Sequence, residues 1–213
     1  MAPTPTASPV ATASGRPPKA LKQERARNTR RTILDAAAQV FAEKGFAAMT
    51  LQDVAERAGL TKGALYFHFS NKESLAVEIV NIYLERWQPL IDSVEQAGLS
   101  PLETLVEILD RTAEVFRTEV PIQAAARLQI ERSLIHADVP TPYVGWIAVM
   151  TELAEQAKEA GELREGLDPA VAARVIVSSF FGMQHMSDML SARADQRERY
   201  REMCDVLLLG IRA

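Results

Sequence analysis

The side chains with the most informative spacing lie between Thr50 and Lys72, in the segment TLQDVAERAGLTKGALYFHFSNK. Thr50 and Asp53 are three residues apart, the spacing at which two side chains bond to the free amide groups that begin a helix. Gly59 suits the left-handed backbone that ends such a helix, and Thr61 is placed to cap a second one. Free amide groups at helix starts bind phosphate. The segment therefore predicts a helix-turn-helix whose second helix reads DNA.

A third helix is predicted to begin at Asn71 or Lys72, because Ser70 and Glu73 have the spacing of another capping pair. The amino end of this helix can also face a phosphate group. Three capped helix starts in so short a segment are difficult to explain by chance.

The distribution of charge agrees with contact to a nucleic acid. Residues 1–72 contain eleven Lys and Arg against five Asp and Glu, a net charge of +6. The whole chain has 24 and 28 of these residues, so residues 73–213 have thirteen against twenty-three, a net charge of −10. Positive charge near the capped helices favours a phosphate backbone, because binding there releases counterions. The alternative explanation is a charged surface that contacts only solvent.

The segment TLQDVAERAGLTKGALYFHFSNKESL resembles the DNA-binding signature of the TetR family of one-component bacterial transcriptional regulators. Its KGALYFHF core is similar to the branch that contains the γ-butyrolactone autoregulator receptors of actinomycetes and their relatives that respond to alkylfurans and butenolides. The segments ARLQIERSLI, PTPYVGW and ARVIVSSFFGMQHMSD also resemble this branch, so the resemblance covers about residues 24–211. It implies a homodimer with a three-helix head and a helical body that houses a small-molecule cavity.

The same resemblance implies a set of DNA-contacting residues at helix ends and on the second helix of the motif. These residues are Thr50, Thr61, Lys62, Gly63, Tyr66, His68 and Lys72. The first turn of the reading helix would approach base edges and phosphates, and the others would contact the phosphate backbone. For Tyr66 the alternative role is core packing. Leu65 and Phe69 already supply apolar groups to this helix, which favours an outward phenol at Tyr66.

The remainder of the chain reads as helices separated by proline and glycine, and it contains no segment that alternates like a strand. A long helix from Lys72 passes Trp87 and is predicted to be kinked by Pro89. Further helix starts are predicted at Pro101 and Pro169. The fold class is therefore all-α, with about nine or ten helices. The predicted domains are a disordered tail over residues 1–21, a DNA-binding domain over 22–72 and a ligand-binding and dimerisation domain over 73–213.

Two features near the start of the chain support these boundaries. Residues 1–19 contain five of the eleven prolines, together with Ala, Ser and Thr, a composition that buries too little apolar surface to fold. Five cations between Lys22 and Arg31 then lead into a helix that is predicted to end at Gly45. This basic lead-in could be an arm that reaches the minor groove or only a solvated extension.

A ligand cavity is indicated by polar and aromatic residues on otherwise apolar helix faces. The candidates are Tyr83, Trp87, Gln129, Tyr143 and Trp146. Butyrolactone receptors typically have tryptophan where this chain has Tyr143. A phenol there, with Gln129 nearby, would suit a ligand that bears a hydroxyl or carboxylate, such as an alkylfuran acid. Arg127 is a further source of charge. The alternative for each candidate is ordinary core packing.

The predicted dimer interface combines two late helices, as in the four-helix bundle that the resemblance implies. The segment around Phe180 is apolar over more than one face, which is typical of a helix buried on two sides. The predicted interface residues are Val177, Phe180, Phe181, Met186, Val206 and Leu209. A signal in the cavity is expected to reach the heads through the long helix that begins at Lys72.

Several classes of function are excluded by what the sequence lacks. It has no GxSxG elbow, no glycine loop for phosphate and no HExxH pair, so we expect no enzyme. A single cysteine, Cys204, gives no disulfide framework and no cysteine pair for zinc, and His136 with Asp138 is best explained by an exposed loop. No cofactor or metal is therefore expected. No apolar run is long enough to cross a membrane and no secretory signal is present, so the predicted location is the cytoplasm.

These observations predict a homodimeric transcriptional repressor that binds double-stranded operator DNA at a pseudo-palindromic site. A small diffusible signal of the alkylfuran, butenolide or γ-butyrolactone type would release it, and its targets would be antibiotic or secondary-metabolite genes. The alternative is a pseudo-receptor or multidrug-sensing regulator of the same fold that responds to antibiotics or to no ligand.

Overall fold

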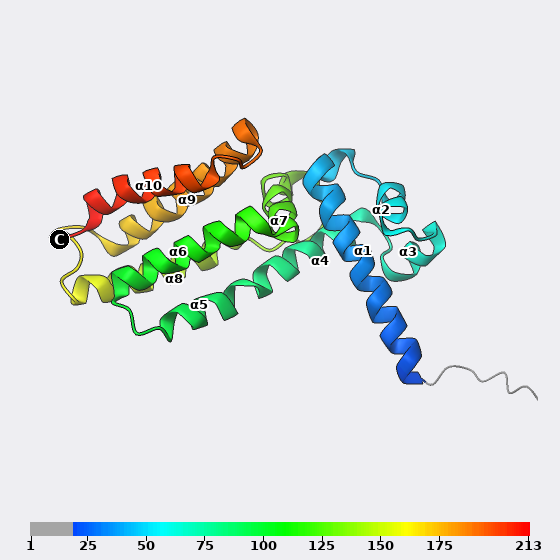
Figure 1. Ribbon diagram of the computed structural model, residues 1–213, viewed down its shortest axis with the longest axis horizontal. Coiled ribbons are helices and arrows are strands. Elements are labelled where there is room, and N and C mark those ends of the chain that lie inside the picture. The colour runs from blue at the N-terminus through cyan, green and yellow to red at the C-terminus, as the bar shows by residue number, and fades with distance from the viewer. Residues whose placement is uncertain (1–18) are drawn as a thin grey trace, which may run out of the picture.

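The computed structural model describes residues 19–213, which form ten α-helices and one short 3-10 turn (Figure 1). Across this described range the only β contact is an isolated bridge between Leu163 and Arg212, so the prediction of an all-α fold is confirmed. Most of the predicted disordered tail lies outside the described residues. Residues 19–21, the last three of that predicted segment, are helical.

The head lies at one end of the molecule and consists of the first helices of the chain (Figure 1). These are α1 (Lys19–Ala48), α2 (Leu51–Ala58), α3 (Lys62–His68) and the start of α4 (Lys72–Glu85). The Thr50 amide donates to Asp53 Oδ2 at 2.9 Å, and the Asp53 amide donates to Thr50 Oγ1 at 3.2 Å, which confirms the predicted capping box. Gly59 ends α2 with a φ of 65°, and Thr61 caps α3.

The start of α4 differs from its prediction in detail. Its cap is Asn71, whose Oδ1 accepts the Ser74 amide at 2.8 Å, and not the pair of Ser70 and Glu73. Asparagine and serine are about equally good N-cap residues, and Asn71 caps the helix in place of its neighbour Ser70.

Helix α1 is interrupted at Gly45, where φ is 72° and ψ is 179°. This backbone conformation lies in the region that only glycine adopts without strain. The chain resumes a helical turn afterwards and buries Phe46 and Met49 in the head. The predicted break at Gly45 is confirmed, although the next residues remain helical.

The long helix that leaves the head divides into α4 and α5 (Trp87–Glu95), with the break at Arg86. Pro89 has no amide proton for the carbonyl of Glu85 and its ring crowds that carbonyl, so the break falls just before the proline. Arg86 also bonds Glu119, with Nη2 to Oε1 at 2.9 Å, which fixes the break against the end of α6.

The body contains α5, α6 (Pro101–Thr118), α7 (Val120–Ile130), α8 (Pro142–Glu159), α9 (Pro169–Ser191) and α10 (Gln196–Ile211). Figure 1 shows α9 and α10 side by side along one face, while α7 lies against the head. Phe116 joins the core, with ring centroids 5.8 Å from Trp87 and 6.0 Å from Phe180. None of the described helices is long and apolar enough to span a membrane.

The turn between α9 and α10 is held by a carboxylate. Asp195 Oδ1 accepts hydrogen bonds from the hydroxyls of Ser191 at 2.6 Å and Ser187 at 2.7 Å, and Arg199 pairs with its other oxygen. These interactions, led by Ser191, lower the pKa of Asp195 to about 2. The turn near Ala194 is therefore ordered, and it fixes the angle between the two helices.

Candidate nucleic-acid interface and ligand cavity

Helix α3 is anchored by two buried side chains and exposes the rest of its surface. Leu65 is fully buried and Phe69 is nearly so. Lys62 and Gly63 are exposed in the first turn, and no atom would lie within 4 Å of a Cβ added at Gly63. Tyr66 is 53% exposed, as expected for a phenol that does not serve the core. The first turn of α3 is thus open to a large partner.

Phe67 is a candidate contact that the sequence analysis omitted. Its ring is 82% exposed, the second highest value among the exposed large apolar side chains, and lies edge-on to His68 at 5.2 Å. Residues two apart on a helix point in nearly opposite directions. The burial of Leu65 on the same helix therefore places Phe67 outward, and this spacing was the signal that could have revealed it.

Two of the predicted backbone contacts are already used within the head. Lys72 Nζ donates to the Phe46 carbonyl at 3.1 Å and lies 4.4 Å from the centre of the Phe46 ring. The Thr50 hydroxyl caps α2. Both residues still mark helix starts, but the Lys72 charge is committed to holding α4 against the end of α1.

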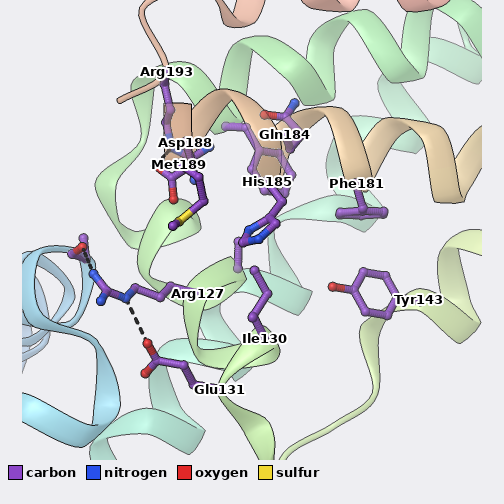
Figure 2. Close-up of a pocket in the computed structure, with 13 residues that line it drawn as sticks. Arg127, Ile130, Glu131, Tyr143, Phe181, Gln184, His185, Asp188, Met189 and Arg193 are labelled. Atoms are coloured by element: carbon purple, nitrogen blue, oxygen red, sulfur yellow. Dashed lines mark hydrogen bonds and ion pairs between the residues drawn. The ribbon is translucent and has the colours of Figure 1, made fainter. Parts of the chain in front are cut away.

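A cavity of about 470 Å³ lies where α7, α8 and α9 meet the end of α1 (Figure 2). Phe116, Phe181, Ile130 and Met189 form much of its apolar wall. Figure 2 shows the Tyr143 hydroxyl directed from α8 towards the side on which Ile130 and His185 lie. Burial raises the pKa of the Tyr143 phenol, so the group is a neutral hydrogen-bond donor. The volume lies within the range of small-molecule pockets.

Gln184 is a cavity residue that the sequence analysis missed. Its side chain is 3% exposed, and neither its amide nitrogen nor its oxygen has a hydrogen-bond partner among the described residues. Burying an unpaired amide is costly, so a polar group in the cavity would stabilise it. The signal in the sequence was a lone amide within the apolar run FFGMQHM.

Of the five predicted pocket residues only Tyr143 lines this cavity, and a ligand-binding role for the other four stays a prediction. Trp87 and Trp146 pack with ring centroids 5.2 Å apart and border a separate cleft of about 160 Å³. Tyr83 is 1% exposed beside Trp87, and burial raises the pKa of its phenol well above the ordinary value. Gln129 is buried, and both of its amide atoms lack partners among the described residues. The three aromatic rings pack against one another in the core, where large rings bury much apolar surface, whereas the unpaired amide of Gln129 is in the same state as that of Gln184.

Arg127 lines the cavity, as its predicted role requires, but it is not free there. It pairs with Glu131, Nε to Oε1 at 3.0 Å, and Nη1 donates to the Ala42 carbonyl at 2.8 Å. Figure 2 shows both interactions at the edge of the cavity that faces the head.

The predicted dimer residues divide into three groups by their exposure in the protomer. Val177 and Phe180 are 4% and 1% exposed, so they are buried within the protomer and the prediction that they form an interface is wrong. Phe181 is half-buried and lies 4.8 Å from the Tyr143 ring. Met186, Val206 and Leu209 are exposed.

The exposed apolar residues on α9 and α10 form a stripe, here called the α9–α10 face. Its members are Val171, Val175, Met186, Met189, Leu190, Val206 and Leu209. On α9 they follow the spacing of one helix face, and the exposed Gly182 lies on the same stripe with open space around it. An apolar surface of this extent is typical of an interaction site.

Residues 33–79 match the profile of "Bacterial regulatory proteins, tetR family". The chain is 39% identical over 190 residues to the A-factor receptor protein of Streptomyces griseus. The aligned region covers 89% of this chain and 66%, slightly under two thirds, of the receptor.

Two solved structures resemble most of the described fold. One, from work on the molecular basis for control of antibiotic production by bacterial hormones, is 47% identical with a TM-score of 0.80, covering 87% of this chain and 98% of that one. The other is CprB of Streptomyces coelicolor bound to its biological operator sequence, 29% identical with a TM-score of 0.79, covering 88% and 90%.

Proposed function

Because the chain belongs to the TetR family of bacterial regulatory proteins, we propose that it is a homodimeric transcriptional repressor that a small diffusible signal releases from operator DNA. The observation that carries this proposal is the cavity, which adjoins the base of a head whose α3 is open to DNA. Residues 22–72 would bind the operator and residues 73–213 would bind the signal and the partner subunit. Such a protein acts in the cytoplasm, where the DNA is.

The chemistry of the cavity supports a mostly apolar ligand with oxygen atoms at one end. Phe116, Phe181 and Ile130 offer apolar contact, and Tyr143 and Gln184 offer hydrogen bonds to a carbonyl, hydroxyl or carboxylate. Alkylfurans, butenolides and γ-butyrolactones meet this description. The relatives named above for a receptor and for hormone control of antibiotic production suggest that the target genes serve antibiotic or secondary metabolism.

The direct test is selection of genomic DNA fragments by the purified protein, followed by release with a panel of alkylfuran carboxylic acids, alkyl butenolides and γ-butyrolactones. Two identical heads related by a two-fold axis should select a near-palindrome. Selection of no common sequence would refute the proposal, and release only by antibiotics would support the multidrug-sensing alternative.

Lys62→Ala should weaken operator binding, because Lys62 is exposed in the first turn of α3. If its ammonium binds phosphate, affinity should fall equally for all DNA sequences, and the slope of log affinity against log salt concentration should become shallower by about 1. If it binds a base, the preference for that base at one operator position should fall by ~1–3 kcal/mol. Fluorescence anisotropy at several salt concentrations distinguishes the two. Lys158→Ala, which removes an exposed lysine from α8, is the control. Equal affinity for wild type and Lys62→Ala would exclude Lys62 from the interface.

Tyr143→Phe should weaken binding of the active panel member by about 1 kcal/mol, the net value of one neutral hydrogen bond. Operator affinity without the ligand should not change, because Tyr143 lies in the body. Titration of protein bound to labelled operator measures both quantities. Tyr200→Phe is the control, since that hydroxyl donates to the Val106 carbonyl at 3.3 Å away from the cavity. A wild-type response from Tyr143→Phe would remove this hydroxyl from the binding site.

A further inference from the structure

The break in α1 exposes backbone groups that the helix itself does not satisfy. Where a helix stops, the last carbonyls and the following amide lose their partners and need others. At Gly45 those partners come from α7 in the body. Arg127 Nη1 donates to the carbonyls of Ala42 at 2.8 Å and Glu43 at 3.1 Å.

Glu131, which caps the C-terminal end of α7 one turn after Arg127, completes the arrangement. Its Oε2 accepts the Phe46 amide on the far side of the break, and its Oε1 accepts from Arg127 Nε at 3.0 Å. One ion pair therefore bonds the backbone of α1 both before and after Gly45. We call Arg127 and Glu131, with these backbone bonds, the α7 latch.

The position of Gly45 shows how closely the α7 latch approaches the head. A Cβ added at Gly45 would lie 2.8 Å from Arg127 Nε and closer still to Glu131 Oε1. Lys72 of α4 donates to the carbonyl of Phe46 at 3.1 Å. Phe46 is thus bonded at its amide by Glu131 and at its carbonyl by Lys72.

The α7 latch also lines the 470 Å³ cavity, together with Ala42 of α1. Its side chains remain partly accessible, at 35% for Arg127 and 20% for Glu131. A partly solvated ion pair is held weakly enough for another acceptor to compete for the guanidinium. By contrast, Tyr83 on α4 does not line this cavity, so the expected route to the head through the long helix is not the one that the cavity contacts.

We propose that the α7 latch transmits the state of the cavity to the DNA-binding head. An oxygen-bearing molecule in the cavity competes for Arg127, the bonds to α1 on either side of Gly45 are lost, and the head is freed from the orientation that fits the operator. This inference rests on the proposed ligand-responsive function. It assigns Arg127 and Glu131 as positioning residues, and it requires differential affinity of the ligand for the two states of the α7 latch.

The contacts can be tested without DNA or ligand by hydrogen exchange of the backbone amides of residues 42–49. Arg127→Gln and Glu131→Gln should each speed exchange of the Phe46 amide by about tenfold or more, since each removes a charge-assisted contact at the break. Arg111→Gln is the matched control, because it removes another i,i+4 pair, with Glu107 at 2.7 Å, that does not contact the head. Wild-type exchange in both α7 variants would overturn the proposal.

The double variant Arg127→Glu with Glu131→Arg separates the α7 latch from an ordinary ion pair. It keeps two opposite charges one turn apart, but a glutamate at 127 cannot donate to the Ala42 and Glu43 carbonyls. The α7 latch predicts that exchange stays fast in this variant. Restored protection would show that only the ion pair matters, which contradicts the proposal.

Transmission is tested by titrating each variant with the selected operator, with and without an alkylfuran carboxylic acid as the probe. Arg127→Gln should bind the operator more weakly than wild type, and the probe should change its affinity by a smaller factor. A wild-type factor in Arg127→Gln would overturn transmission. If the wild-type protein is released by no probe in the panel, the proposed function fails, a result distinct from unchanged exchange at Phe46.

Discussion

Val206→Glu combined with Leu209→Glu should convert the protein from a dimer into a folded monomer. Both side chains are exposed in the protomer, at 70% and 87%, so the substitution costs the protomer fold little. In a dimer that buries the α9–α10 face, each subunit would bury two unpaired carboxylates, each at a cost of a few kcal/mol or more. Light scattering after size-exclusion chromatography measures the mass.

The loss of the dimer should also remove most of the operator affinity. A single head binds one half-site without the effective concentration that its tethered partner supplies, a loss of about 10²–10⁴-fold. Val144→Glu is the matched control, because Val144 is a 66% exposed valine on α8, outside the α9–α10 face. A double variant of normal dimer mass would place the interface elsewhere.

Phe180→Ala should lower the free energy of unfolding by about 3–5 kcal/mol, the usual cost of emptying a buried aromatic site. Phe180 is 1% exposed, and its ring lies 5.4 Å from Phe181 and 6.3 Å from Tyr200. The loss belongs to the protomer core and should appear at every protein concentration. Urea denaturation at several concentrations measures it and separates it from weaker association.

The matched control for Phe180→Ala is Val144→Ala, an exposed truncation expected to change stability by no more than about 0.5 kcal/mol. If Phe180→Ala kept wild-type stability but weakened dimer formation, Phe180 would belong to the dimer interface and not to the protomer core. The same result would mean that α9 presents a different face to its partner.

The local features of the head could be predicted from the sequence because their causes are local. Thr50, Asp53, Gly59 and Thr61 act on backbone groups within four residues, so their spacing is sufficient. The N-cap of α4 shows the limit of this local prediction: Ser70 was expected, but the adjacent Asn71, a residue of similar capping strength, caps the helix.

The features that depend on tertiary packing were less predictable. An α9 that is apolar on several faces does not reveal in its sequence which face meets its own core. The sequence therefore predicts an interface role for the buried Val177 and Phe180 and does not distinguish the exposed Val171 and Val175. The α7 latch joins residues 84 or 85 positions apart, and no local pattern marks it.

The contact at Gly45 has a consequence for how this sequence can diverge. Among the glycines of the described chain with positive φ, Gly59, Gly98, Gly161 and Gly166 have open space where a Cβ would go, and Gly45 does not. The residue types at positions 45, 127 and 131 therefore constrain one another: the ion pair links 127 with 131, and a side chain at 45 would clash with both. A related chain with a larger residue at the position of Gly45 must also have moved or lost the arginine–glutamate pair, so these three positions should change as a group and offer a means of sorting relatives by how their heads are held.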